Sequence, residues 1–530
     1  MSPKQQNSFT YIDLFSGIGG FRLALDAMGG RCINFSEINR DAVEAYCLNF
    51  KETGTLNLGD ITKIRELPSH DVLTAGVPCQ SWSIAGRNLG FDDDRGQLWN
   101  DTLHLLNQSR PKAFIFENVK GLVDPRNQKA LHFILDRIRQ AGYFARHFVL
   151  TSSDYGVPQD RVRVYIVGFR QEKYLSKFNL APPKRYELKL RDILLVTACK
   201  PHSQSALGSV DLFGEPAREK RRYRRTESMN DFFLFNDIRN GPTTIHSWDL
   251  KQTTARQKAI CMLLLRNRRK SAYGRLDGNP LSLVHFQQLD RSIQAAELDA
   301  LVDIGILKTV AYSFAVGSTI SATLCHAEAT VVAQVSAGNA SLDSLRECRE
   351  LRIAKVALDK TIARLVAIGV LNCIETRYEF RYTKISTGID GINRVFLPKS
   401  EAFPTLVASD TNDFIALKDI EAETAEGYKM AFLQEIYSKR LFRKISKEES
   451  CRIQGFPGDF TLPESRSRWM KLIGNSVSVP VISALMAAIA ETGCFSELAN
   501  STDDVGKTVA GIPKSRDEVR HEEVNRAILA

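Results

Sequence analysis

The first 170 residues alternate short apolar runs with segments of helical spacing. The first run, residues 11–15, is followed by a glycine-rich turn at residues 16–20 and by helical spacing over residues 21–28. Further runs of strand length lie at residues 32–36, 71–75, 113–116 and 163–169. This alternation predicts an α/β fold with a mainly parallel sheet covered by helices on both faces. Ligands of such sheets bind at the carboxyl ends of the strands.

A short internal repeat lies farther along the chain. Residues 301–307, LVDIGIL, recur 64 residues later as residues 365–371, LVAIGVL. Both copies predict a helix that ends at glycine and leads into a strand. Residues 377–384 alternate like one arm of a hairpin. Two winged-helix-like units would explain the repeat, and so would ordinary packing of a helix against a strand.

Composition indicates a soluble protein with more than one domain. The 530 residues are 43% hydrophobic and 25% charged, which is ordinary for a globular protein. No apolar run reaches the roughly 18 residues of a membrane span, so we expect a cytoplasmic protein with no membrane partner. The ten cysteines include no C-x-x-C pair, so neither a zinc ribbon nor another metal site is expected.

The net charge of +10 is concentrated in the middle of the chain. Residues 171–400 hold 35 lysines and arginines against 23 aspartates and glutamates, a net charge of +12. The rest of the chain is nearly neutral, at −2. A basic insert in a neutral frame favours contact with a polyanion such as nucleic acid, although basic surfaces also serve solubility.

Candidate reactive groups follow the ends of the predicted strands. One strand leads to Pro78 and Cys79 in the segment GVPCQSWS, and another ends at Glu117. A thiol and a carboxyl group at one sheet edge suit nucleophilic attack with proton transfer. Glu37 is spaced from the glycine turn like a carboxylate that binds ribose hydroxyls, and Asp60 is placed to accept from an adenine amine. These last features alone fit any nucleoside-containing cofactor, NAD included.

Eight sequence blocks, in order, resemble the DNA cytosine-5 methyltransferase family of the bacterial restriction–modification type. They cover residues 11–169 and 443–495 and leave the region between them only weakly matched. The blocks are DLFSGIGGFRLAL from Asp13, SEIN from Ser36, GDIT from Gly59, GVPCQSWSIAG from Gly76, FENVKGL from Phe116, QDRVRVYIVGF from Gln159, RKISKEESCRIQGFP from Arg443 and IGNSVSVPV from Ile473. The resemblance implies a Rossmann-like S-adenosylmethionine-dependent methyltransferase domain with a large inserted α+β target-recognition region.

The resemblance also implies a reaction: transfer of a methyl group from S-adenosyl-L-methionine to C5 of a cytosine flipped out of duplex DNA. It makes Cys79, as the thiolate, the nucleophile that attacks C6 of cytosine. Glu117 would hold the base and protonate N3, and Arg161 and Arg163 would support the site electrostatically. The base that removes the C5 proton is not identified by the match.

Further positions match the family's cofactor and DNA contacts. Ile38 stands where many relatives carry tryptophan, which predicts a weaker stacking contact with adenine. The positions matched to cofactor contacts are Phe15, Gly17, Ile18, Glu37, Ile38, Asp60, Ile61, Pro78, Leu98, Asn475, Ser476 and Val477. Those matched to DNA contacts are Ser81, Ser83, Gln159 and Thr405. Residues 81–98 resemble a loop that closes over the flipped base, with an ordinary surface loop as the alternative.

The blocks divide the chain into four expected parts. These are a first catalytic and cofactor-binding part at residues 1–170, a target-recognition region of more than one module at 171–442, a C-terminal return to the catalytic domain at 443–495, and a polar tail at 496–530.

Local signals inside the later parts are mixed. The basic clusters Arg218–Arg225 and Arg266–Lys270 suit phosphates or a solvated face equally. Phe232–Phe235 favours a core position over an interface. Ser446 and Glu449 have the spacing of a capping box that begins a helix.

Three alternatives remain open at this stage. The substrate could be RNA, as in the tRNA-directed branch of the family. The chain could be a DNA-binding protein on an inactive methyltransferase frame, or an NAD oxidoreductase, which leaves the Cys79 and Asn475 blocks unexplained. We expect a monomer that acts on double-stranded DNA. A separately acting cognate restriction endonuclease is an expectation from the family alone.

Overall fold

The computed structural model describes most of the chain between Phe9 and Ser496. The described residues are 9–78, 98–180, 188–195, 229–236, 241–275, 278–318, 323–384 and 387–496. Several predicted features lie outside them, namely Cys79, Ser81, Ser83, the loop over residues 81–97, the cluster Arg218–Arg225 and the tail after Ser496.

A six-stranded sheet forms the core of the larger α/β part, in the order β2-β1-β3-β4-β7-β5. Its strands are β1 (Phe9–Leu14), β2 (Gly30–Ser36), β3 (Val72–Gly76), β4 (Ala113–Val119), β5 (Phe144–Thr151) and β7 (Val162–Phe169). Strands β2, β1, β3 and β4 pair in parallel, whereas β7 pairs antiparallel with β4 and β5. The predicted mainly parallel sheet is confirmed, with β7 as its reversed strand.

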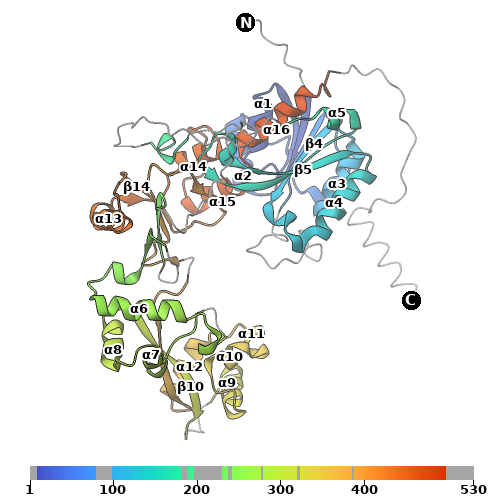
Figure 1. The fold of residues 1–530 in the computed structure, drawn as a ribbon. Helices are drawn as coiled ribbons and strands as arrows, with labels where there is room; N and C mark the ends of the chain where they lie inside the picture. The colour runs from blue at the N-terminus through green and yellow to red at the C-terminus, as the bar shows by residue number, and fades with distance from the viewer. Residues whose placement is uncertain are drawn as a thin grey trace, which may run out of the picture.

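Helices cover both faces of this sheet (Figure 1). On one face α1 (Gly20–Asp26) packs against α16 (Val479–Glu491), and both contribute to one buried cluster with the sheet. On the other face α3 (Leu98–Ser109) and α4 (Gln128–Gln140) share a second cluster. The remaining helices of the α/β part are α2 (Arg40–Phe50), α5 (Glu172–Lys177), α14 (Lys447–Gln454) and α15 (Arg466–Asn475). The end of the chain thus returns to pack beside its beginning.

One apolar stretch, Arg466–Glu491, is long and apolar enough to cross a membrane by length and composition. Residues 476–478 divide it into α15 and α16, and 67% of its most apolar window is buried inside the protein. Its side chains join the buried cluster that holds α1 on the sheet. The stretch is therefore accounted for as core of the α/β part.

A second, five-stranded sheet connects the α/β part with the rest of the insert, in the order β15-β14-β12-β8-β9. Phe232–Phe235 forms β8 with all four side chains buried, which confirms the expected core position. Helix α13 (Ala425–Ala431) and the π-helix Phe432–Tyr437 cover the sheet, and the rings of Phe233 and Phe432 stack 3.9 Å apart. The other strands are β9 (Thr244–Ile245), β12 (Arg394–Phe396), β14 (Asp413–Ala416) and β15 (Phe442–Arg443).

Residues 255–380 form a tandem module of two similar units, at the lower end of the molecule in Figure 1. The first unit comprises α6 (Ala255–Asn267), α7 (Leu283–Leu289), α8 (Ala295–Asp303) and β10 (Leu307–Val316). The second comprises α9 (His326–Ser336), α10 (Leu342–Glu347), α11 (Arg349–Ile353), α12 (Leu358–Ala367) and β11 (Leu371–Phe380). Each unit has its own buried cluster. The internal repeat thus corresponds to two helix-to-strand junctions, α8–β10 and α12–β11.

The two units are joined through their strands, which pair antiparallel. Leu307 pairs with Phe380 at one end of this two-stranded sheet, and Val316 pairs with Leu371 at the other. A shift of 64 residues turns Leu307 into Leu371 and Val316 into Phe380. The two-stranded sheet therefore has an approximate internal two-fold symmetry. The expected hairpin arm at residues 377–384 is only partly right, because the strand ends at Phe380 and its partner lies four helices earlier in the chain.

Each unit also completes its sheet with the other unit's strand. Leu281, between α6 and α7, bridges to Tyr378 on β11, and Ser341, between α9 and α10, bridges to Ser313 on β10. In each unit the order is thus helix, a single bridged residue, helices and a strand that pairs with the other unit's strand, which resembles the order of a winged helix with one wing strand exchanged.

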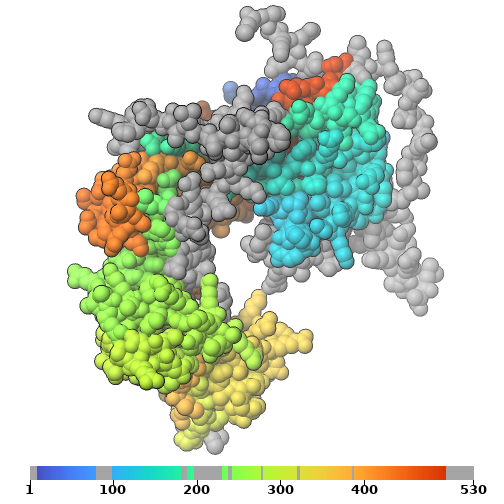
Figure 2. Space-filling model, in the orientation of Figure 1, coloured from blue at the N-terminus to red at the C-terminus, as the bar shows by residue number. Residues whose placement is uncertain are grey.

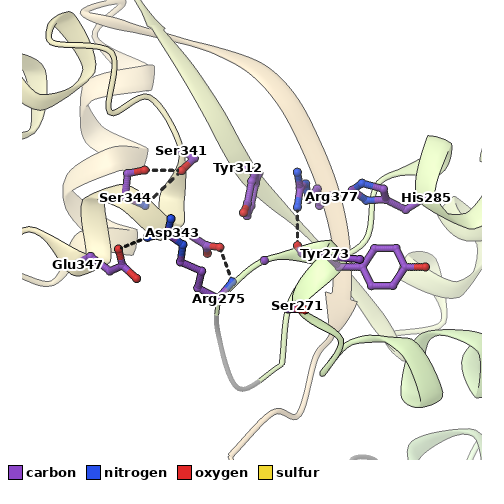
Figure 3. Close-up of a pocket in the computed structure, with 12 residues that line it drawn as sticks. Ser271, Tyr273, Arg275, His285, Tyr312, Ser341, Asp343, Ser344, Glu347 and Arg377 are labelled. Atoms are coloured by element: carbon purple, nitrogen blue, oxygen red, sulfur yellow. Dashed lines mark hydrogen bonds and ion pairs between the residues drawn. The ribbon is translucent and has the colours of Figure 1, made fainter.

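A cavity of about 370 Å³ lies where the two units meet (Figure 3). In its wall the Arg275 backbone N–H donates to the Asp343 carboxylate (3.0 Å), and the Arg275 guanidinium pairs with Glu347 (2.9 Å). Arg377 of β11 donates to the Tyr273 carbonyl oxygen (3.1 Å). Because these contacts run from one unit to the other, they fix the two units as one body.

Candidate active site

The ends of four neighbouring strands bring the predicted site residues to one edge of the central sheet. Leu14 of β1 pairs with Ser36 of β2 and Ala75 of β3, and Gly76 of β3 pairs with Glu117 of β4. At or directly after these positions come Phe15, Gly17, Glu37, Pro78 and Glu117. The edge is the one at which ligands of such sheets bind.

Glu117 lies near the end of β4, and its carboxyl group is buried beside an arginine. The residue is 9% exposed, and its Oε1 lies 3.0 Å from Nε of Arg163 on the neighbouring strand β7. Burial raises the pKa of Glu117 above its ordinary value, while the charges of Arg163 and Arg161 oppose that rise. A carboxyl group of this kind is suited to hold a polar partner and to donate a proton to it.

Asn118 positions the chain that leads to the predicted nucleophile. Its Nδ2 donates to the Val77 carbonyl oxygen (3.2 Å). Pro78 follows Val77 and is the last described residue before Cys79. The segment entering Cys79 is therefore tied to the residue that follows Glu117.

Arg161 is almost completely buried, with 2% of the residue exposed, and joins three distant segments. Its guanidinium donates to the carbonyl oxygens of Leu406 (3.0 Å), Gly474 (3.2 Å) and Ser476 (2.6 Å). Gln454 of α14 adds a second donor to the Ser476 carbonyl (3.0 Å). Arg161 thus holds the C-terminal block and the chain before α13 against the site, in addition to its charge effect on Glu117.

Gln159 and Thr405 meet at a small two-stranded sheet. β6 (Gln159–Asp160) pairs in parallel with β13 (Phe403–Pro404), and the Thr405 hydroxyl donates to the Asp160 carbonyl oxygen. The Gln159 side chain is fully buried, and neither end of its amide has a hydrogen-bond partner among the described residues. Because an unpaired buried amide is costly, we expect a polar group of a ligand or of another chain segment at Gln159.

Glu37 closes on the glycine turn. Its Oε2 accepts from the Gly17 N–H (2.9 Å), and its Oε1 accepts from the Ile38 N–H (2.8 Å). Gly17 has φ of +55°, in the left-handed region that favours glycine. A Cβ on Gly20 would lie 2.7 Å from the Val477 side chain, so a larger residue there would push the C-terminal block away.

Asn57, which no motif marks, connects Glu37 with the loop of Asp60. Its Oδ1 accepts from the backbone N–H groups of Glu37 (3.1 Å) and Gly59 (3.0 Å). Asp60 in turn accepts from the Thr62 N–H (3.0 Å) and begins the short 3₁₀ helix after it. The available signal for Asn57 is an asparagine two residues before a glycine, which is typical of many turns.

The other positions matched to cofactor contacts differ in exposure. Ile18, Ile61, Ser476 and Val477 are buried, Phe15, Pro78 and Leu98 are half-buried, and Asn475 is exposed.

Comparison with known proteins decides the family. The model of the C-5 cytosine-specific DNA methylase family matches residues 9–491. The chain belongs to the C-5 cytosine-specific DNA methylase family. The methylase is 41% identical to "Type II methyltransferase M.HgiBI" of Herpetosiphon aurantiacus, over 91% of this chain and 96% of that protein. It is 39% identical to "Type II methyltransferase M.HgiCII" of the same organism, over 92% of this chain and 98% of that protein.

A third relative matches a smaller part of the chain. "Type II methyltransferase M.HhaI" of Haemophilus parahaemolyticus is 38% identical to this methylase over 37% of the chain and 59% of that protein. The two Herpetosiphon relatives therefore match the methylase through its long insert as well as through the α/β part. The resemblance indicated by the eight blocks is confirmed, and the enzyme class is that of a DNA cytosine C5 methyltransferase.

The cofactor end of this methylase fits a nucleoside. Ile38 is 73% exposed and stands directly beside the Glu37 carboxylate, so an apolar surface adjoins hydrogen-bond acceptors. Asp60 lies on the adjoining loop that Asn57 holds. An aromatic base suits the apolar surface, and hydroxyl and amine groups suit the two carboxylates.

Proposed function

We propose that this methylase transfers a methyl group from S-adenosyl-L-methionine to C5 of a cytosine flipped out of double-stranded DNA. The observation that carries the proposal is the buried Glu117–Arg163 pair at the sheet edge, beside the segment that enters Cys79. Addition to a pyrimidine ring requires an acid and a thiol, and the structure describes the acid and the segment that leads to the thiol.

The chemistry begins at Cys79. Its thiolate attacks C6 of the cytosine and forms a C–S bond, while Glu117 donates a proton to N3, so that electron density collects at C5. S-adenosyl-L-methionine would supply an electrophilic methyl group. C5 would form a bond to that methyl carbon as its bond to the sulfonium sulfur breaks, and the sulfur would keep the electron pair and leave as a neutral thioether. Loss of the C5 proton to a base, with return of the N3 proton to Glu117, breaks the C–S bond and releases the Cys79 thiolate. The cytosine must leave the base stack first, at a cost of a few kcal/mol.

The remaining site residues hold these partners. Arg163 orients Glu117, and Arg161 keeps the Ser476 segment on the α/β part. Glu37 and Asp60 bind the ribose hydroxyls and adenine amine of the cofactor, with Ile38 against the ring. The residues assigned to DNA are Ser81, Ser83, Gln159 and Thr405.

The relatives named Type II methyltransferases support a biological role. We infer that the enzyme acts as a cytoplasmic monomer and protects host DNA within a restriction–modification system, alongside a separate endonuclease. DNA modified by the enzyme should then resist an endonuclease that cleaves at the same site.

The test is methylation of unmethylated genomic DNA with S-adenosyl-L-methionine, read by base-resolution sequencing of 5-methylcytosine. We expect methylation at one short motif, and none with Cys79→Ala. A parallel reaction on tRNA separates the alternatives. Methylated tRNA with unmodified DNA would refute the DNA substrate, and an active Cys79→Ala variant would refute the covalent mechanism.

A further inference from the structure

The two units of the tandem module have equivalent cores. Under the shift of 64 residues, Leu298 and Leu301 of α8 correspond to Ile362 and Leu365 of α12. All four side chains are buried in their unit's cluster. The helix that leads into the wing therefore packs in the same way in both units.

The surfaces of these equivalent segments carry opposite charge. Residues 290–303 contain four carboxylates and one arginine, a net charge of −3. Residues 354–367 contain three cations and one carboxylate, a net charge of +2. Lys360 of the second unit stands where the first unit has Ala296, and Asp303 of the first where the second has Ala367. Because the cores are alike, packing does not explain this difference.

The cations of the second unit are also available to a partner. Arg349, Arg352, Lys355 and Lys360 are exposed, and none of them forms an ion pair with another described residue. We call these four residues the α11 face. In the first unit, by contrast, the cation Arg256 is already paired with Glu297 (2.9 Å).

The position of the α11 face, like its positive charge, suits contact with a ligand that also reaches the α/β part. Helix α11 lies on the side of the module toward the α/β part, and α8 lies on the opposite side (Figure 1). Figure 2 shows open space between the yellow edge of the module and the α/β part. The contacts around Arg275 hold the first unit against α10, so the face has a fixed support.

We propose that the α11 face binds the phosphate backbone of the DNA substrate, and that the equivalent surface of the first unit does not. The inference rests on the proposed function, because the ligand is the duplex that the enzyme methylates. Unpaired exposed cations gain from phosphate contact by releasing counterions. In the first unit Arg256 neutralises Asp290 and Glu297, and the exposed carboxylates Asp299 and Asp303 of α8 repel the backbone. Phosphate contacts orient a protein on DNA without reading its sequence.

A matched pair of variants tests this difference in the full-length enzyme. Arg291 of the first unit and Lys355 of the second occupy equivalent positions, and both are exposed. Lys355→Ala and Arg291→Ala therefore remove the same charge from the two units. The dissociation constant is measured as a function of salt concentration for two unmethylated duplexes. One carries the motif that the enzyme methylates, and the other lacks it.

We expect Lys355→Ala to lower the slope of log Kd against log salt by about 0.9, the contribution of one phosphate contact. Lys355→Ala combined with Lys360→Ala should lower it by about twice that amount. Arg291→Ala should keep the wild-type slope. The ratio of affinities for the two duplexes should stay the same in every variant, because the sequence preference is not affected.

Equal slopes for Lys355→Ala and Arg291→Ala would overturn the inference, whether both fall or neither changes. Thermal unfolding is followed in parallel, and exposed positions of this kind should leave the Tm unchanged. If Lys355→Ala unfolds, Lys360→Gln repeats the test, because glutamine is a good helix former. Wild-type enzyme that methylates genomic DNA while the slopes are equal refutes this inference alone. Wild-type enzyme that methylates no DNA refutes the proposed function itself.

Discussion

The α/β part and the tandem module reach their structures by different routes. At the site of the α/β part, Arg161 contacts carbonyl groups that lie 245, 313 and 315 residues away in the chain. The tandem module instead uses one local pattern twice and joins the copies through the two-stranded β10–β11 sheet. Catalytic geometry thus depends on single buried polar residues, whereas the charge of the module's surface differs between copies with the same core. Substitutions in the two regions should therefore separate chemistry from DNA affinity.

We expect substitution of Cys79 to separate the rate of methyl transfer from DNA affinity most clearly. Cys79→Ala removes the proposed nucleophile, so methyl transfer should fall by about 10⁴-fold or more. The dissociation constant for duplex DNA should change by less than about threefold, because binding by the insert needs no thiolate. Single-turnover transfer of labelled methyl groups and direct DNA binding measure the two effects. A Cys79→Ala enzyme that loses DNA binding along with turnover would break the comparison.

Glu117→Gln should have the next largest effect, a loss of about 10²- to 10⁴-fold in single-turnover rate. Burial raises the pKa of Glu117, so the carboxyl group keeps its proton to a higher pH than an ordinary glutamate. The wild-type rate should fall as the pH rises through that raised pKa, because only the protonated form donates. The same decline should be missing from the residual activity of Glu117→Gln. A decline that persists in the variant would assign the proton to another group.

Arg161→Ala tests the long-range contacts that hold the site of the α/β part together. It leaves the carbonyl oxygens of Leu406, Gly474 and Ser476 without this donor, and it opens a cavity in a buried position. We expect the free energy of unfolding to fall by about 3 kcal/mol, with loss of turnover. Chemical denaturation measures the change in stability. Arg161→Lys keeps the charge but loses the planar set of guanidinium donors, so its free energy of unfolding should lie between those of the wild type and Arg161→Ala. Unchanged stability would show that the three bonds contribute little.

The smallest effect is expected at Ile38. Ile38→Trp places an aromatic ring at an apolar position that is 73% exposed. Stacking on adenine should strengthen cofactor binding by about 1 kcal/mol, or about fivefold. Calorimetric titration with S-adenosyl-L-methionine checks this, with Ile38→Leu as the control of similar size. Equal affinities for both variants would place the adenine away from Ile38.

Sequence patterns predicted the buried central strands of the α/β part and missed the exposed edge strand β5. The apolar runs of β3 and β4 are buried on both faces, whereas β5 lies at the sheet edge with most side chains exposed or half-buried. The capping box is also confirmed, since Ser446 accepts from the Glu449 N–H (3.1 Å). The bonds of Arg161 could not be predicted, because backbone carbonyl groups leave no mark in a sequence.

The insert shows a second limit of sequence patterns. The repeat predicted both helix-to-strand junctions, but the exchange of strands depends on pairing between distant segments. The cluster Arg266–Lys270 left open whether its cations bind phosphate or face solvent. One of them does neither: Arg268 is 3% exposed and lies 3.5 Å from Glu379. A run of cations in a sequence does not distinguish a buried arginine from an exposed one.

The exchange of wing strands has a consequence for how such a module can evolve. Once each unit relies on a strand of the other, deletion of either copy leaves the survivor with an unpaired strand edge, which invites aggregation. The two copies should therefore be retained together and should unfold in a single cooperative transition. Substitutions of outer residues leave the strand pairing intact, whereas loss of either copy removes it.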